Sequence, residues 1–175
     1  MTLYDINSLE ISRLTTRNYS TSFSLGVRLL QKPFRLPIYA IYGFVRVADE
    51  IVDTFHEHPK REMLEEFKKD TFHAIAHGIS TNPILHSFQW VVNRYRIDHD
   101  LIHAFLDSME MDLTEKEHDL ESFKKYVYGS AEVVGLMCLR IFYADDDAGY
   151  RKLVHPARKL GEAFQKINFL RDIRS

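Results

Sequence analysis

Apolar residues recur at helical spacing through nearly the whole chain, and residues that break helices are few. The 175 residues include only 7 glycines and 5 prolines. The prolines stand at positions 33, 37, 59, 83 and 156. This pattern predicts an all-α fold, because long amphipathic windows with few breakers are typical of packed helices.

Capping residues help to place the ends of the expected helices. Asn82 and Asp100 suit N-caps. Pro37 suits a first helical turn, and Gly78 suits a C-terminal stop. The expected helices are Ser8–Ser20, Pro37–Thr54, Lys60–Gly78, Asn82–Tyr95, Asp100–Leu113, Leu120–Phe142 and Ala148 to the end.

The length and the 45% hydrophobic content are enough for one domain with a core, over residues 1–175. The last segment, GEAFQKINFLRDIRS, still has helical periodicity at Ser175 and shows no stop signal. We therefore expect a chain cut in mid-helix and a domain that lacks its C-terminal helices.

Charge and cysteine content narrow the partners and the compartment. A net charge of -2 offers no long basic stripe for a nucleic-acid backbone. The single cysteine, Cys138, lies in an apolar run and is expected to pack as a small hydrophobe, as in a reducing compartment. The N-terminus does not have the pattern of a secretory signal, and the longest apolar stretch, Val133–Ala144, is too short to span a bilayer. These features predict a cytoplasmic protein.

Two carboxylates in the segment RVADEIVD give the first candidate site. Asp49 and Asp53 stand four residues apart, so on a helix they face the same way, about 6 Å apart along the axis. Both could approach one hard cation. The alternative is a solvated helix face on which Arg46 forms an ion pair with Asp49 or Glu50. Such an exposed pair contributes little to stability. The aromatic and aliphatic residues from Tyr39 onward favour the cation site.

The second candidate site lies near the C-terminus. Gln165, Asn168 and Asp172 fall at i, i+3 and i+7, and therefore share one helix face. Amide and carboxylate oxygens suit magnesium, which binds through a few protein groups together with substrate phosphates. The alternative is a polar, exposed terminal helix. Together, the two helices would form a clamp for a metal-bridged diphosphate.

Five segments, in order, resemble the signatures of the squalene/phytoene synthase family. They are Ser20 to Ser24, Tyr42 to Asp53, Met109 to Leu113, Tyr126 to Gly135 and Gln165 to Asp172. The resemblance covers the chain from about Ser20 onward. It implies the helical bundle of the isoprenoid synthases, of which this chain would be the N-terminal part.

The resemblance also implies roles for particular residues. Catalytic residues would be Tyr42, Arg46 and Tyr128, and the magnesium ligands would be Asp49, Asp53, Asn168 and Asp172. Substrate-binding residues would be Ser20, Ser22, Phe23, Val134, Gly135, Gln165 and Arg171. Ser20, Ser22, Arg46 and Arg171 would lie near diphosphate, whereas Phe23, Val134, Gly135 and Gln165 would flank the prenyl chains.

The implied activity is head-to-head condensation of two prenyl diphosphates, geranylgeranyl or farnesyl, through a cyclopropyl diphosphate. The product would be phytoene, dehydrosqualene or squalene, with release of diphosphate. The implied cofactor is Mg²⁺, with Mn²⁺ as an alternative, and NADPH is needed only if the product is squalene. The style of GSAEVVG and QKINFLRDIRS is closest to bacterial phytoene synthases, which implies carotenoid biosynthesis.

One departure concerns the metal site. The second family motif reads NxxxDxxxD, and this chain stops one residue before the last aspartate would fall. We therefore expect an incomplete metal site, which puts the activity of the 175 residues by themselves in question.

Other readings of the sequence are weaker. A non-catalytic scaffold or assembly factor with the same fold would be expected to lose ligand aspartates, and here they are present. A general helical terpene cyclase would use a single substrate. Glu115 and His118 match half of a di-iron motif, but their charged surroundings predict a loop.

Two further expectations concern association. A hydrocarbon product is insoluble in water, so we expect the protein to associate peripherally with the inner face of a membrane. Apolar helix faces left uncovered by later helices predict self-association of the chain.

Overall fold

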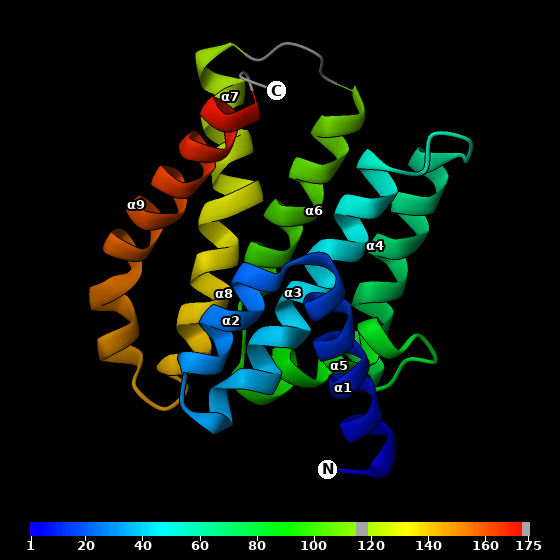
Figure 1. Cartoon of the computed structure of the whole chain (residues 1–175), viewed down its shortest axis with the longest axis vertical. Helices are drawn as coiled ribbons and strands as arrows, with labels where there is room; N and C mark the ends of the chain where they lie inside the picture. The colour runs from blue at the N-terminus through cyan, green and yellow to red at the C-terminus, as the bar shows by residue number, and fades with distance from the viewer. Residues whose placement is uncertain (115–118, 173–175) are drawn as a thin grey trace. The chain divides into compact units, whose positions relative to one another are not determined.

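The computed structural model describes the backbone of residues 1–114 and 119–172, and the side chains of these residues up to 167. Every regular element in these ranges is a helix (Figure 1), which confirms the all-α prediction. The chain divides into two compact units, Met1–Ile97 and Asp98–Ser175. Whether the two units form the single domain expected over residues 1–175 stays a prediction.

The first unit contains five helices. They are α1 (Leu3–Tyr19), α2 (Thr21–Leu29), α3 (Lys32–Asp53), α4 (Lys60–His77) and α5 (Pro83–Tyr95). Helix α1 packs against α3 and α5, and apart from Leu9 its buried residues carry small hydroxyl side chains. Ser8, Ser12 and Thr16, spaced four apart, are all fully buried. A Cβ added at Gly43 of α3 would come within 2.9 Å of Ser12 Oγ, so this glycine permits the close approach.

Aromatic rings form the centre of the first unit's core. Phe44 of α3 and Phe88 of α5 are fully buried, and their rings stack with centroids 3.8 Å apart. The ring of Phe67 of α4 also stacks on that of Phe44, with centroids 5.4 Å apart. Burial of each such side chain contributes about 2 kcal/mol to stability. The stack therefore helps to hold α3, α4 and α5 together.

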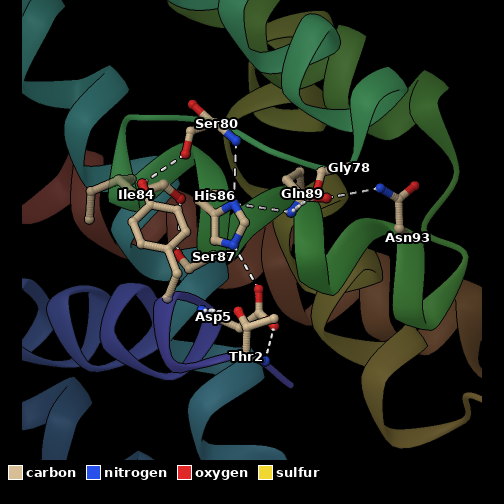
Figure 2. A network of polar contacts seen from close by, with 10 residues as sticks. Thr2, Asp5, Gly78, Ser80, Ile84, His86, Ser87, Gln89 and Asn93 are labelled. Atoms are coloured by element: carbon tan, nitrogen blue, oxygen red, sulfur yellow. Dashed lines mark hydrogen bonds and ion pairs between the residues drawn. The ribbon is translucent and has the colours of Figure 1, made fainter.

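A closed polar network ties α1 to the start of α5 (Figure 2). His86 Nε2 lies 2.8 Å from Asp5 Oδ1, and the Ser80 backbone N–H donates to His86 Nδ1 at 3.3 Å. Because Nδ1 accepts, the proton is on Nε2 and is donated to Asp5. Gln89 donates to the carbonyl of Gly78 at 3.1 Å. We call these residues the Asp5–His86 network.

Two predicted helix ends are confirmed. Helix α4 ends at His77, and Gly78 follows in the left-handed conformation with φ of 69°. Asn82 caps α5, since its side-chain oxygen accepts from the Ile84 N–H at 3.0 Å.

Other predicted ends were wrong. Helix α1 begins five residues before Ser8, because Thr2 and Asp5 form a capping box. Pro37 lies inside α3, not in its first turn, since Pro33 already occupies that turn. Asp100 is not an N-cap: α6 begins at His99, and Asp98 accepts from the Asp100 N–H at 3.0 Å.

Helix α2 is a further correction, because no helix was predicted over Thr21–Leu29. Its N-cap is Ser20, whose Oγ accepts a hydrogen bond from the Phe23 N–H at 3.3 Å. Nine residues are too few for a strong periodic signal.

The second unit contains α6 (His99–Thr114), α7 (Leu120–Val127), the π-helical turn η1 (Tyr128–Glu132), α8 (Val133–Phe142) and α9 (Asp147–Asp172). The helix expected over Leu120–Phe142 is therefore present, with a π turn in its middle. This turn packs against α6 and α9. A Cβ at Gly129 would lie 2.4 Å from the Ala104 carbonyl oxygen, so only glycine fits there.

Two remaining expectations concern the loop and the membrane. The predicted loop around Glu115 and His118 lies outside the described residues. In the part of the chain that is described, no helix combines the length and apolarity needed to cross a bilayer.

Candidate active site

The start of α2 and the middle of α3 bring three predicted site residues together. The ring of Phe23 stacks on that of Tyr42, with centroids 4.7 Å apart and planes 25° apart. Burial raises the pKa of the Tyr42 phenol, and a hydrogen bond with Ser20 opposes this only in part. Tyr42 is therefore a protonated donor at neutral pH. Ser22, in the first turn of α2, is exposed.

Arg46 lies one turn further along α3, between an aromatic ring and a carboxylate. Its guanidinium is 4.5 Å from the centroid of the Tyr19 ring, and it forms an ion pair with Glu50. Only 26% of the Arg46 side chain and 14% of the Glu50 side chain are exposed. The Arg46–Glu50 pair of the alternative interpretation thus exists, but it is not on a solvated face.

One hydrogen-bond donor of Arg46 is unsatisfied. Its Nε atom is buried and has no hydrogen-bond partner among the described residues. An unsatisfied buried donor is costly, on the order of 1–3 kcal/mol. Such a group calls for an explanation, and an anionic ligand would satisfy it.

Electrostatics keep this pair charged. Burial by itself lowers the pKa of Arg46, but the hydrogen bond and charge of Glu50, helped by Asp49, outweigh it and leave the pKa raised. The hydrogen bond from Arg46 holds the pKa of Glu50 below its usual range, against the effect of burial. Tyr19, Tyr42, Arg46, Asp49 and Glu50 are called the Arg46 cluster below.

Asp49 and Asp53 stand in the last two turns of α3, which ends at Asp53. Asp49 is half-buried and Asp53 is exposed. The last turn contains no basic residue. A helix C-terminus carries partial negative charge, which adds to the attraction of two carboxylates for a cation. This end of α3 therefore suits a hard cation.

Tyr128 occupies the first position of the π turn in the second unit. The guanidinium of Arg158 lies 5.0 Å from the centroid of its ring, and Arg158 Nε donates to Glu132 Oε2 at 2.6 Å. Gln165 donates from Nε2 to Ser130 Oγ at 3.2 Å. The π turn thus presents polar side chains to α9, and such turns are frequent at functional sites.

A cavity of about 370 Å³ opens beside Tyr128. Its lining is rich in cations, and the lining residues are Leu120, Phe123, Lys124, Val127, Tyr128, Glu132, Arg158, Lys159, Glu162 and Lys166. Sequence reasoning missed Arg158 and Glu132. They are 26 residues apart, so no local spacing links them.

Val134 and Gly135 lie at the start of α8, which packs against α9. Val134 is half-buried. A Cβ at Gly135 would meet the Ala157 carbonyl oxygen of α9 at 3.7 Å, an ordinary contact. Further along α8, burial raises the pKa of the Cys138 thiol to about 12, which agrees with a packing role.

The second metal motif lies beyond the described side chains. The α9 backbone is described to Asp172, but the side chains of Asn168, Arg171 and Asp172 are not. Among the described residues, no three histidine, cysteine or acidic side chains stand together as a metal site. The two motifs belong to different units, so their convergence on one diphosphate stays a prediction.

Comparison with known proteins decides the family. The model of the squalene/phytoene synthase family matches residues 16–175. The chain belongs to the squalene/phytoene synthase family. This confirms the resemblance drawn from the five segments.

Relatives within the family carry several activities in their names. A presqualene diphosphate synthase of Rhodopseudomonas palustris is 29% identical over 157 residues, covering 87% of this chain and 54% of that protein. A 4,4'-diapophytoene synthase of Staphylococcus haemolyticus is 27% identical over 164 residues, covering 90% and 55%. The chain spans about half the length of the curated relatives it matches.

Solved structures agree on the fold. A dehydrosqualene synthase superimposes with a TM-score of 0.82 at 24% identity, over 95% of this chain and 57% of that chain. A squalene synthase of Alicyclobacillus acidocaldarius gives 0.85 at 21% identity, over 99% and 64%. The chain therefore has the helical fold of the isoprenoid synthases, as predicted.

Proposed function

We propose that this chain supplies the first part of a synthase that joins two prenyl diphosphates head to head. The observation that carries the proposal is Arg46. Its charge is held in a half-buried setting, and its Nε donor has no partner in the described part of the chain. A diphosphate oxygen beside the Tyr42 hydroxyl would satisfy that donor.

Mg²⁺ fits the residues that would hold it. Asp49 and Asp53 offer carboxylate oxygens at the C-terminal end of a helix. Asn168 and Asp172 would add an amide and a carboxylate oxygen, and Mn²⁺ is an alternative with the same ligands. When bound, the ion would neutralise the leaving diphosphate and favour ionisation of the donor.

The protein's own residues orient the reactants. The bond between the allylic carbon and the diphosphate oxygen breaks, and Arg46, Tyr42 and Arg171, with Ser20 and Ser22, hold the released diphosphate. The acceptor's double bond attacks the cation, and loss of a proton gives a cyclopropyl diphosphate. Tyr128 would line the reaction centre with Tyr42. Phe23, Val134, Gly135 and Gln165 would flank the prenyl chains and keep water away from the cation.

The proposed product follows from the second ionisation and rearrangement. Loss of a proton gives phytoene from geranylgeranyl diphosphate or dehydrosqualene from farnesyl diphosphate, as in carotenoid biosynthesis. A hydride from NADPH instead gives squalene. Because each product is a hydrocarbon, we place the reaction in the cytoplasm at the inner face of a membrane.

Self-association of the chain belongs to the same proposal. Leu160, Phe164 and Ile167 share one face of α9, and each is 60% exposed. Contiguous exposed apolar side chains favour association. We expect oligomers by light scattering at high concentration, whereas a monomer at all concentrations would contradict this expectation.

The activity is tested by incubation with geranylgeranyl or farnesyl diphosphate and Mg²⁺, with products identified by mass spectrometry. Two proteins are compared: this chain, and this chain joined to the remaining half of the Rhodopseudomonas palustris relative, whose own two halves serve as the positive control. We expect a C40 or C30 product that is lost in Asp49→Ala. Silence from a well-folded fusion would favour the non-catalytic scaffold.

A further inference from the structure

Five cations gather on the first unit around a hollow of about 400 Å³, well apart in sequence from Asp49 and Asp53. Arg13 and Arg17 come from α1, Arg28 from α2, and Lys32 and Arg35 from α3. Glu10, Leu36 and Tyr39 complete the lining. We call the five cations the basic face. It contrasts with the whole chain, whose net charge is -2.

The basic face has little compensating negative charge. Glu10, the one carboxylate in the lining, forms an ion pair with Arg13 at 2.5 Å. Arg17, Arg28 and Lys32 form no ion pair with any carboxylate in the described part of the chain. Like charges held together destabilise a fold, so an external anion would relieve the repulsion.

Exposed leucines adjoin these cations. Leu25 and Arg28 line a neighbouring hollow together with Arg17, and Leu14 lines another with Arg13 and Arg17. Leu14 and Leu25 are 56% and 55% exposed. Leu29, four residues after Leu25 and therefore on the same side of α2, is 88% exposed. Free phosphate in water gains nothing from such leucines, whereas a lipid surface does.

We propose that the basic face, with Leu14, Leu25 and Leu29, docks the protein on a membrane rich in anionic lipids. The cations attract phosphate headgroups, and the leucines insert between them. This inference deepens the proposed function and rests on it, since a synthase with a hydrocarbon product needs a lipid phase beside it.

Vesicle co-sedimentation without substrate tests the docking surface independently of catalysis. The chain is mixed with phosphatidylcholine vesicles, with and without one third phosphatidylglycerol. We expect binding only to the anionic vesicles, weakening as salt rises. The triple variant Arg17→Gln/Arg28→Gln/Lys32→Gln should bind roughly a hundredfold more weakly, because each basic residue near an anionic surface is worth about a fivefold change.

Two further variants make the result specific. Lys69→Gln/Arg94→Gln/Arg151→Gln removes the same charge from exposed positions elsewhere, and should bind like the wild type. Leu25→Ser/Leu29→Ser should weaken binding about tenfold or more with the charge unchanged. Circular dichroism checks that each variant is helical.

Several outcomes would overturn the proposal. They are binding to neutral vesicles as strong as to anionic ones, the same loss of binding in both triple variants, and no binding to either kind of vesicle. Titration with inorganic diphosphate adds a further arm: diphosphate binding that is lost in the first triple variant, without vesicle binding, would reassign the basic face to a free anion. None of these results depends on whether the chain has synthase activity.

Discussion

The Asp5–His86 network and the Arg46 cluster are two polar groups in the same helical unit, and they are built differently. In the network, His86 is 3% exposed, and both of its ring nitrogens have partners. In the Arg46 cluster, the side chains are partly exposed, and the buried Arg46 Nε has no hydrogen-bond partner among the described residues. The first arrangement stabilises the fold, whereas the second leaves bonding capacity for a ligand.

The largest expected effect comes from the open cluster. Arg46→Met should lower synthase activity of the fusion by about 10²–10³, as when one donor to a developing anion is removed. The free energy of unfolding should also fall, because Glu50 loses its ion-pair partner in a half-buried setting, but activity per folded molecule should fall far more. Product formation and urea unfolding are measured on the same preparations.

The control for this prediction is Arg94→Met, a change at an exposed position on α5. It should leave both activity and stability near wild type. If Arg46→Met unfolded the chain while activity per folded molecule stayed normal, the two polar groups would not differ in the way described.

Substitution in the Asp5–His86 network should lower stability rather than activity. His86→Leu leaves the Asp5 carboxylate and the Ser80 N–H without their partner, at a cost of about 2–3 kcal/mol in the free energy of unfolding. Activity per folded molecule should not change. His73→Leu, at an exposed histidine of α4, should change stability by less than about 0.5 kcal/mol. Equal effects of the two substitutions would remove the structural role given to His86.

A smaller effect is expected from pH. The hydrogen bonds from the Thr2 backbone and from His86 lower the pKa of Asp5 below its ordinary value of 3.8. A carboxyl whose pKa falls on folding stabilises the fold above its unfolded pKa and loses this contribution as pH falls through the folded pKa. Wild type should therefore exceed Asp5→Asn in stability above pH 3.8, and the difference should shrink below it.

Urea unfolding at a series of pH values measures this difference. Asp70→Asn, an exposed change on α4, is the control and should show no such convergence. A difference that grew as pH fell would have the wrong sign for a lowered carboxyl pKa.

Sequence periodicity predicted most of the helices because caps such as Asn82 and Gly78 act locally. It missed α2, which is short, and the π turn at Tyr128, which depends on the close approach of Gly129 to the Ala104 carbonyl. It placed Arg46, Asp49 and Asp53 on one helix. The contact of Arg46 with Tyr19 could not be predicted, because the two residues come from different helices.

Binding of a prenyl diphosphate analogue is the sharpest test of the Arg46 cluster as a diphosphate site. Calorimetry would compare a non-ionisable geranylgeranyl thiodiphosphate, with Mg²⁺, on the wild-type fusion, Arg46→Met and Arg94→Met. We expect binding to wild type and Arg94→Met, and a loss of about 10–100-fold in affinity in Arg46→Met, as for one charge-assisted hydrogen bond to phosphate. Unchanged affinity in Arg46→Met would show that Arg46 does not bind the diphosphate.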